Sequence, residues 1–446
     1  MAGDIRPFGE LFAAPTRNGL TRPKAVRGSG IKMVNMGELF AHPRLRNAPM
    51  DRVLLNKAES ERFLLADGDL LFARQSLVLE GAGKCSIFLH DTEPVTFESH
   101  VTRVRLDPDR GNPQFYFYYL QSHHGRAAIR SIVEQGAGAS GIRGSDLWSL
   151  NVKWRPIEEQ RAIAHILGTL DDKIELNRRM NETLGAMARA VFKSWFVDFD
   201  PVRAKVEGRD PGLPKPLADL FPDSFEDSEL GEIPKGWIVS PLGKVCKRIT
   251  DGSHSSPRSV EKGRPMASVK DMHEWGFELS GCRRISEQDY QELVRADCRP
   301  LAQDVLIAKD GSYLKHIFVV ERDLDLVVLS SIAILRPTED MDPHLIAFSL
   351  QSDGTMARME QYVSGAVLQR IVLKDFRRLP ILVPPRRVQQ AWAPIASAMV
   401  QRCWRNMDEI EALASLRDTL LPKLISGEVR VSDGNQLRRA TSSRCP

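Results

Sequence analysis

A seven-residue repeat of mostly apolar positions occurs in two long segments of the chain. It comprises Ile163, Leu170, Asn177, Leu184 and Val191 in the first segment, and Trp392, Met399, Asn406, Leu413 and Leu420 in the second. An apolar heptad repeat is typical of helices that pack side by side along their length. The pattern therefore predicts two long helices, over residues 157–197 and 385–425, that pair as an antiparallel coiled coil.

Both repeats carry an asparagine at the third position, Asn177 in the first and Asn406 in the second. A buried asparagine in a helix seam lowers stability and pairs best with another polar group, so it fixes the register of the helices. We therefore expect Asn177 and Asn406 to meet, or nearly meet, near the middle of the helix pair. The alternative is that either side chain is merely solvated on a helix face.

The two repeats belong to a duplication that extends beyond the helices. Asp146 and Asp375 are 229 positions apart (375 − 146), and so are Gln160 and Gln389 (389 − 160). Adding the same 229 to the first set of heptad positions gives the second set. A constant offset of this kind indicates two copies of one structural unit, and here a pseudo-two-fold arrangement.

Ahead of each predicted helix lies a segment that mixes strand and helix patterns. Residues 1–156 and 237–384 contain apolar runs typical of strands, at 70–73, 101–106, 304–308, 316–320 and 332–336, and helical patterns at 113–134 and 343–362. We expect two α+β domains, one in each copy. The Pro-rich segment 198–236 is predicted to be an extended linker, because proline fixes φ and interrupts helices. Residues 426–446 are expected to form a tail.

Composition fits this organisation and adds little about function. A chain of 446 residues is long enough for two ordinary domains and their connections. A formal net charge of +4 permits nucleic-acid binding without requiring it. The six cysteines form no C-x-x-C pair, which argues against a zinc site or disulfide framework and indicates a reducing compartment. Apolar runs are far shorter than the ~20 residues of a membrane span, so no membrane association and a cytoplasmic location are expected.

Three motifs resemble parts of catalytic sites, and the context of each argues against that function. Residues 136–141 match G-x-G-x-x-G, but a dinucleotide site needs a strand before this motif and a helix after it. Residues 81–85 resemble the end of a phosphate-binding loop, but Cys85 replaces the hydroxyl residue that binds Mg²⁺. Asn112 begins an Asn-Pro-Gln-Phe element similar to one in methyltransferases, yet it is predicted to start a helix. We expect no catalytic residue and no metal site.

Residues 156–177, with the sequence PIEEQRAIAHILGTLDDKIELN, closely resemble the central region of type I restriction-modification specificity subunits. Further similar segments are FKSWFVDFDP at 192–201, LGEIPKGW at 230–237, TDGSHSSP at 250–257 and LPKLISGEV at 421–429. The similar segments cover nearly the whole chain. The second helix departs from the usual acidic, alanine-rich start, since it carries Arg386, Arg387, Trp392 and Pro394. Pro394 is expected to loosen or kink the first turn, which puts equal partner binding at both helix ends in doubt.

The resemblance implies a non-catalytic, sequence-specific DNA-binding subunit. Each α+β domain would be a target-recognition domain for one half of a two-part site in double-stranded DNA. The helices would set the gap between the halves and dock modification (methyltransferase) subunits, two of them, which restriction/translocase subunits join. The complex would direct both methylation and restriction. S-adenosylmethionine, ATP and Mg²⁺ would serve the partner subunits, with no cofactor bound by this chain.

The length of the predicted helices suits a spacer. A helix of about 39 residues spans roughly 58 Å, which exceeds one turn of DNA, about 34–36 Å.

Basic and amide side chains at predicted strand ends and glycine-containing turns are the candidates for DNA contact. Lys and Arg bind phosphate, and Arg, Lys, Asn and Gln recognise base edges. The candidates are Lys32, Asn35, Arg74, Gln75, Lys84 and Arg143 in the first domain, and Arg258, Lys270, Lys309, Ser312, Tyr313, Lys315, Gln369 and Arg370 in the second. The preferred candidates are the pairs Arg74–Gln75 and Lys309–Asp310, because Arg74 and Lys309 directly follow equivalent predicted strands. The alternative for any single residue is an ordinary solvated side chain.

Two other classes of function remain open on these patterns. A coiled-coil interaction protein without DNA binding would have no salt-sensitive affinity for duplex DNA. A nuclease or methyltransferase would need a metal or cofactor site, which the motifs do not provide.

Overall fold

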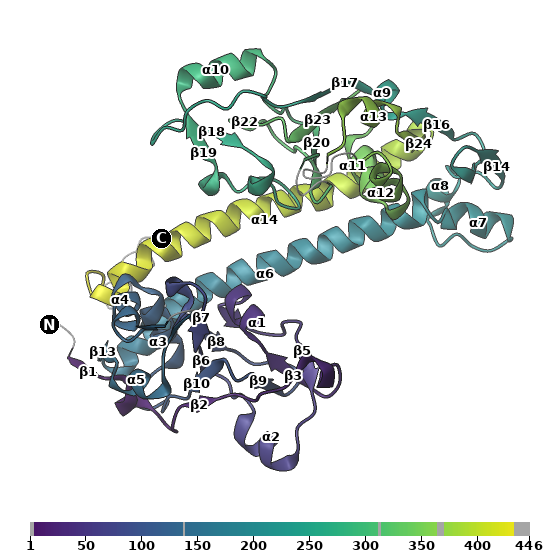
Figure 1. The fold of residues 1–446 in the computed structure, drawn as a ribbon. Coiled ribbons are helices and arrows are strands. Elements are labelled where there is room, and N and C mark those ends of the chain that lie inside the picture. Colours follow the sequence, from purple (N-terminus) through teal and green to yellow (C-terminus); the bar gives the residue numbers. More distant parts are fainter. Residues whose placement is uncertain (1–3, 137–138, 311–313, 364–369, 432–446) are drawn as a thin grey trace, which may run out of the picture. The chain divides into compact units, whose positions relative to one another are not determined.

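The computed structural model describes residues 4–136, 139–310, 314–363 and 370–431 of the chain. Helices and strands are mixed throughout (Figure 1). The chain divides into two compact units. The first holds the residues up to Glu175 together with those from Glu411 onward, and the second spans Leu176–Ile410. No helix in the described ranges is long and apolar enough to cross a membrane.

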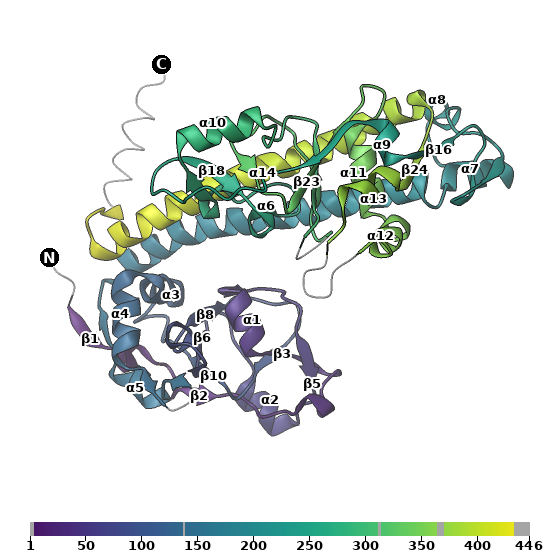
Figure 2. The ribbon, with the colours of Figure 1, turned by 45° about the horizontal axis from the view of Figure 1, so that its top comes forward.

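Two long helices, α6 (Ile157–Phe196) and α14 (Arg386–Ser426), contain 40 and 41 residues and each contributes to both units. In the first unit, Arg417 on α14 donates a hydrogen bond to Asp171 on α6 at 2.7 Å. In the second unit, Asn406 donates to Asn181, further along α6, at 2.7 Å. Residue numbers rise along α6 while those of the partners fall along α14. The predicted antiparallel helix pair is confirmed, and both views show α6 and α14 side by side (Figure 1 and Figure 2).

Pro394 was expected to loosen or kink the first turn of the second helix, but it lies eight positions after Arg386 (394 − 386), and α14 continues through it. Proline lacks the N–H that would bond to the preceding turn. The same part of the helix is held by packing, because Trp392 is fully buried and its ring meets those of Phe192, Phe196 and Phe348 at 5.7, 5.5 and 5.7 Å. Tertiary packing thus keeps this turn helical.

The α+β domain of the first unit is built on a five-stranded sheet with smaller sheets beside it. The five-stranded sheet has the order β2 (Arg17–Asn18), β10 (Val101–Val104), β6 (Leu70–Ala73), β8 (Cys85–Phe88) and β4 (Arg44–Leu45). The smaller sheets are β5 (Asp51–Val53)–β3 (Ile31–Val34)–β9 (Val95–Phe97), β11 (Glu134–Gln135)–β12 (Ser140–Gly141)–β7 (Gln75–Ser76), and β1 (Ile5–Pro7)–β13 (Asn151–Lys153). The helices are α1 (Met36–Ala41), α2 (Lys57–Phe63), α3 (Pro113–Gln121), α4 (His123–Ser131) and α5 (Gly144–Ser149).

The α+β domain of the second unit repeats the main features of this plan. Its main sheet has the order β17 (Cys246–Asp251), β23 (Ile332–Pro337), β20 (Val305–Ala308) and β21 (Ile317–Val319). The smaller sheets are β19 (Arg283–Ile285)–β18 (Arg264–Ala267)–β22 (Val327–Val328) and β16 (Ile238–Pro241)–β24 (Pro380–Val383). The helices are α9 (Leu242–Val245), α10 (Glu287–Arg295), α11 (Pro343–Gln351), α12 (Asp353–Glu360) and α13 (Leu373–Arg378).

Strand directions match between the two domains, which confirms the duplication. In the main sheets, β6 pairs antiparallel with both β10 and β8, and β20 pairs antiparallel with both β23 and β21. In the three-stranded sheets, β3 is antiparallel to β5 and parallel to β9, and β18 is antiparallel to β19 and parallel to β22. This mixture of directions is specific enough to identify two copies of one topology.

The duplication extends to polar contacts inside each domain. Asp69, just before β6, accepts from Arg105 at 2.6 Å, and Asp304, just before β20, accepts from Arg336 at 2.8 Å. Gln160 at the start of α6 accepts from the backbone N–H of Asn112, the N-cap of α3, and Gln389 at the start of α14 accepts from that of Asp342, the N-cap of α11. The glutamines that revealed the offset in the sequence therefore connect each long helix to the α+β domain that precedes it.

The segment 198–236 is folded, and the prediction of an extended linker is wrong. It contains α7 (Asp200–Val206), α8 (Lys215–Ala218) and a hairpin of β14 (Phe225–Ser228) with β15 (Gly231–Pro234). Pro201 and Pro216 lie in the first turns of α7 and α8, where the missing N–H has no helical partner to lose. Phe221 is buried, with its ring 5.3 Å from that of Trp195. Aromatic packing of this kind stabilises a folded segment, and the linker prediction did not consider it.

Candidate nucleic-acid interface

Equivalent strands of the two domains end at the preferred pair of predicted DNA contacts. β6 and β20 are buried along their whole length. The residue after β6 is Arg74, whose backbone N–H donates to His100 O at 2.8 Å, just before β10. The residue after β20 is Lys309, whose backbone N–H donates to Ser331 O at 2.9 Å, just before β23. Both side chains therefore leave the main sheet at the same point of the duplicated fold.

In the first unit, Arg74 and Gln75 share a hollow with the turn that follows β12. Strand β7 begins at Gln75 and pairs with β12, so that both residues line a hollow of about 290 Å³ together with Arg143. Arg143 is exposed, and its guanidinium lies 2.6 Å from the Glu134 carboxylate. Arginine and glutamine side chains at one hollow provide donors for phosphate oxygens and for base edges.

The other three predicted contacts of the first domain have partners within the protein. Lys32 lies 3.0 Å from the Asp91 carboxylate, and its side chain is only 12% exposed. Asn35 caps the N-terminus of α1 in a capping box. Lys84 donates to Phe40 O at 3.0 Å, and burial lowers the pKa of Lys84, with the nearby Arg126 adding to the effect. DNA contact by these three residues stays a prediction, and the structure assigns each of them a structural contact.

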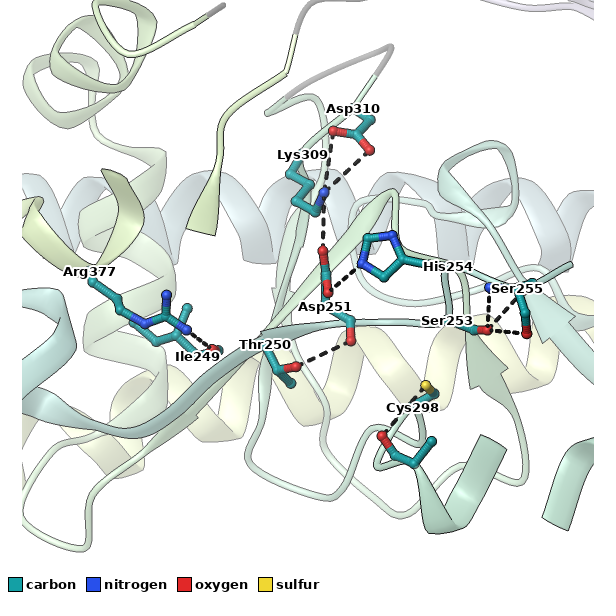
Figure 3. A network of polar contacts seen from close by, with 11 residues as sticks. Ile249, Thr250, Asp251, Ser253, His254, Ser255, Cys298, Lys309, Asp310 and Arg377 are labelled. Atoms are coloured by element: carbon teal, nitrogen blue, oxygen red, sulfur yellow. Dashed lines mark hydrogen bonds and ion pairs between the residues drawn. The ribbon is translucent and has the colours of Figure 1, made fainter. Parts of the chain in front are cut away.

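Lys309 in the second unit lies in a polar network at the end of the sheet (Figure 3). Its Nζ is 3.3 Å from the carboxylates of both Asp251 and Asp310, and its side chain is only 8% exposed. On the other side of Asp251, His254 places Nε2 at 3.3 Å, with a side chain that is 77% exposed. Lys309 therefore balances two carboxylates inside the domain, whereas His254 presents the network to solvent.

The turn that carries Asp251 and His254 packs against the backbone of a neighbouring strand. A Cβ on Gly252 would lie 2.1 Å from Val328 O, and a Cβ on Gly19 of the first domain would lie 2.2 Å from Phe97 O. Only glycine permits so close an approach. The sequence analysis did not select His254 or Asp251 as site residues, although both lie in the TDGSHSSP segment that carried part of the resemblance.

The remaining candidates of the second domain are exposed or fall outside the described residues. Arg258, Lys270, Lys315 and Arg370 are all exposed. The backbone of Arg370 forms a β-bridge with Asp310, which places it beside the Lys309 network. Ser312, Tyr313 and Gln369 lie outside the described residues.

The two asparagines of the heptad repeats are both buried in the helix interface, at 0% and 1% exposure for Asn177 and Asn406. Asn177 donates to Glu409 at 2.9 Å, and Asn406 donates to Asn181 at 2.7 Å. Their hydrogen bonds thus run across the helix pair to other residues instead of to each other. Asn181 was missed, although its spacing of four from Asn177 places both on one face of α6. A role of Asn177 and Asn406 in fixing the register stays a prediction.

The chemistry of the described residues offers binding groups and no obvious reactive ones. Among these residues, no three or more His, Cys, Asp or Glu side chains are grouped to hold a metal ion. Cys85, Cys246, Cys282, Cys298 and Cys403 are all buried. Burial raises the pKa of Cys246, Cys282 and Cys403 to about 12, so these thiols stay protonated and are poor nucleophiles.

Known proteins are similar to this chain in sequence over most of its length. Residues 17–186 match the type I restriction modification DNA specificity domain. The type I restriction enzyme MjaIX specificity subunit of Methanocaldococcus jannaschii is 24% identical over 96% of this chain and 93% of its own length. The HindI specificity subunit of Haemophilus influenzae is 23% identical over 81% of this chain and 86% of its own length.

A solved structure shares the fold as well. The crystal structure of the S subunit of a type I restriction-modification system from M. genitalium superposes with a TM-score of 0.56 at 17% sequence identity, and covers 94% of this chain and 95% of that one. The domain match, the full-length relatives and the shared fold agree with each other and with the resemblance found in the sequence. The chain is thus similar in sequence to type I restriction-modification specificity subunits and shares the fold of one of them.

Proposed function

We propose that this chain is a type I restriction-modification specificity subunit and recognises a two-part DNA site. Each α+β domain would be a recognition domain that binds one half of the site. The observation that carries the proposal is the duplicated position at the ends of β6 and β20. There the same backbone geometry places Arg74 and Gln75 in one copy, and in the other Lys309 and Asp310, in a network whose exposed member is His254. Equal scaffolds with unequal side chains suit two half-sites of different sequence.

The long helices would set the gap between the two half-sites. At 1.5 Å per residue, helices of 40 and 41 residues are each about 60 Å long. One turn of DNA is about 34–36 Å, so a helix of this length is long enough to bridge more than one turn. Buried polar contacts between the helices, such as that from Asn406 to Asn181, support a single register and hence a single gap.

The same helices would dock two modification subunits, and restriction/translocase subunits would join the complex. Met187 on α6 and Leu416 on α14 are separated by the same offset of 229 (416 − 187) and are 50% and 47% exposed. Large apolar side chains left half exposed at equivalent positions suit two copies of one partner. S-adenosylmethionine, ATP and Mg²⁺ would serve those partners, which carry out methylation and restriction where this chain directs them.

Selection from a random duplex library tests the DNA-binding proposal. The purified chain, with and without the cognate modification subunit, is incubated with the library across a salt series, and the retained DNA is sequenced. We expect a two-part motif with a fixed gap, and affinity that falls steeply with salt because phosphate contacts release counterions. Retention without any motif, or no retention at low salt with the partner present, would reject DNA recognition and leave a scaffold function.

Charge substitution at the two exposed apolar positions tests partner docking separately. Met187→Glu and Leu416→Glu should each reduce the number of modification subunits bound per chain from two to one, as measured by light scattering of the purified complex. The matched control is Leu54→Glu, an exposed apolar residue of the first recognition domain. Unchanged stoichiometry in both helix variants would contradict docking at these positions.

A further inference from the structure

Three apolar side chains stand in solvent in the loop that joins β6 to β8. Leu77 is 89% exposed, Val78 60% and Leu79 37%. The base of the loop is closed by backbone hydrogen bonds, from Gly83 N to Ala73 O at 2.8 Å and from Ala73 N to Lys84 O at 2.9 Å. These apolar side chains contribute little buried surface to the stability of the fold. Neighbouring apolar side chains left in solvent indicate a contact outside the chain.

The position of the tip points to DNA. The same loop carries Arg74 and Gln75, and β7 joins it to the strand that leads to Arg143. The apolar tip therefore follows directly in sequence the strand β7, whose first residue lines the hollow of the candidate interface. Three side chains are too few for a stable protein–protein interface, which buries about 800 Å² per partner. They match the size of a contact with one or two base pairs.

The chemistry of DNA then restricts what an apolar tip can recognise. The major groove is wide enough to admit protein secondary structure, and the apolar group displayed there is the C5-methyl group of thymine. We propose that Leu77 and Val78 contact the C5-methyl group of a thymine in the half-site bound by the first recognition domain. The inference rests on the proposed function and names one base feature that this domain recognises.

Removal of a single methyl group from the DNA tests the contact directly. Once the selected site is known, each thymine of both half-sites is replaced in turn by deoxyuridine, which lacks only the C5-methyl group. Binding is measured for the full chain with its modification subunit, for the double variant L77S/V78S, and for Ile5→Ser as control, another exposed apolar residue of the same domain. Loss of one buried methyl group should weaken wild-type binding about fourfold.

We expect deoxyuridine to weaken binding at a thymine of one half-site only. The wild type and the Ile5→Ser control should show the same loss of affinity. The double variant should bind the unmodified site more weakly and show no further loss with deoxyuridine, because the methyl group has lost its partner. Equal deoxyuridine losses in wild type and double variant, or a first half-site without thymine, would overturn the inference. So would a double variant that binds DNA normally but no longer binds the modification subunit, which would identify the tip as a protein contact. In the first two outcomes the two-part motif itself persists, so the proposed function would stand.

Discussion

The two units attach their recognition domains to the long helices through different chemistry at equivalent positions. In the first unit, Asp171 on α6 is buried and accepts from Tyr118 of α3 at 2.6 Å and from Arg417 of α14 at 2.7 Å. Burial raises the pKa of Tyr118, and the Asp171 charge adds to the effect, so the phenol stays protonated as a donor. One carboxylate thus joins three elements of the first unit.

In the second unit, the corresponding positions are apolar. The offset of 229 places Val400 at the position of Asp171 and Ala188 at that of Arg417, and α11 places Phe348 where α3 has Tyr118. All three are buried in one apolar cluster, in which Phe348 stacks on Phe192 with ring centroids 5.8 Å apart. The duplicated backbone therefore accepts either a directional polar junction or a packed apolar one, and each copy is sensitive to different changes.

The largest expected effect comes from removing the carboxylate of the polar junction. Asp171→Val leaves the Tyr118 hydroxyl and the Arg417 guanidinium without their shared partner, and should lower the free energy of unfolding of the first unit by about 3 kcal/mol. The triple variant Y118F/D171V/R417A installs the side chains of the second unit and should recover most of that loss, because the unpaired groups are gone. Chemical denaturation measures both. A triple variant no more stable than Asp171→Val would show that the two junctions are not interchangeable.

The next effect concerns pH and is confined to the second unit. His344, the second residue of α11, is buried and lies 2.7 Å from the Glu321 carboxylate, whereas the second residue of α3 in the first unit is Gln114. Burial alone would lower the pKa of His344, but hydrogen bonds to Asp342 and Glu321 outweigh it and raise the pKa to about 9.

Because the folded protein holds this proton more tightly than the unfolded chain, the stabilisation is complete below the unfolded pKa of about 6.5 and disappears as the pH rises through 9. Denaturation midpoints of the second unit should fall over that interval in the wild type. His344→Gln, which copies the first unit, should remove this part of the pH dependence. Parallel pH profiles for wild type and variant would exclude His344 as the group responsible.

A smaller effect is expected from substitutions at the ends of β6 and β20, and it should differ between the two copies. Arg74→Ala should weaken binding to the selected DNA about tenfold, because it removes donors available to a base edge or a phosphate. Lys309→Ala should act mainly on stability, because it leaves the carboxylates of Asp251 and Asp310 without their cation. DNA affinity and thermal unfolding measured on both variants distinguish these roles. A lysine variant of normal stability with weak DNA binding would mean that Lys309 contacts DNA after all.

The smallest expected effect lies at the helix interface. Asn406→Leu leaves the Asn181 side-chain oxygen without its donor and should cost about 1 kcal/mol, while the double variant N181L/N406L should be close to wild type because both polar partners are gone. If these asparagines fix the register, the stable double variant should select DNA sites with more than one gap length. A single unchanged gap would place the control of register elsewhere.

The sequence predicted the features that depend on periodicity. The heptad positions and the offset of 229 were enough for two antiparallel helices and a duplicated α+β fold. Partners across the helices could not be predicted, because the heptad period does not determine the axial stagger that sets Asn177 opposite Glu409. The folded segment 198–236 was missed because Pro201 and Pro216 suggest a broken chain, although each stands in a first turn.

The candidate site was predictable only in part. Arg74 was selected because it follows an apolar run, and the structure shows that this run is a buried strand that ends there. The structural contact of Lys309 depends on Asp251, which lies 58 positions earlier (309 − 251) and is brought close only by the folding of the sheet. Local sequence therefore indicates where a side chain leaves a strand, and tertiary structure decides whether it remains available for a ligand.

The most direct test of two-part recognition is a comparison of the DNA motifs selected by the wild type and by the double variant R74A/Q75A, each with its modification subunit. Both residues belong to the first recognition domain and line its hollow. The account predicts two half-sites with a fixed gap for the wild type. The variant should lose sequence preference in one half-site only, with the other half and the gap unchanged. Equal loss in both halves, or one continuous motif for the wild type, would contradict recognition by two separate domains.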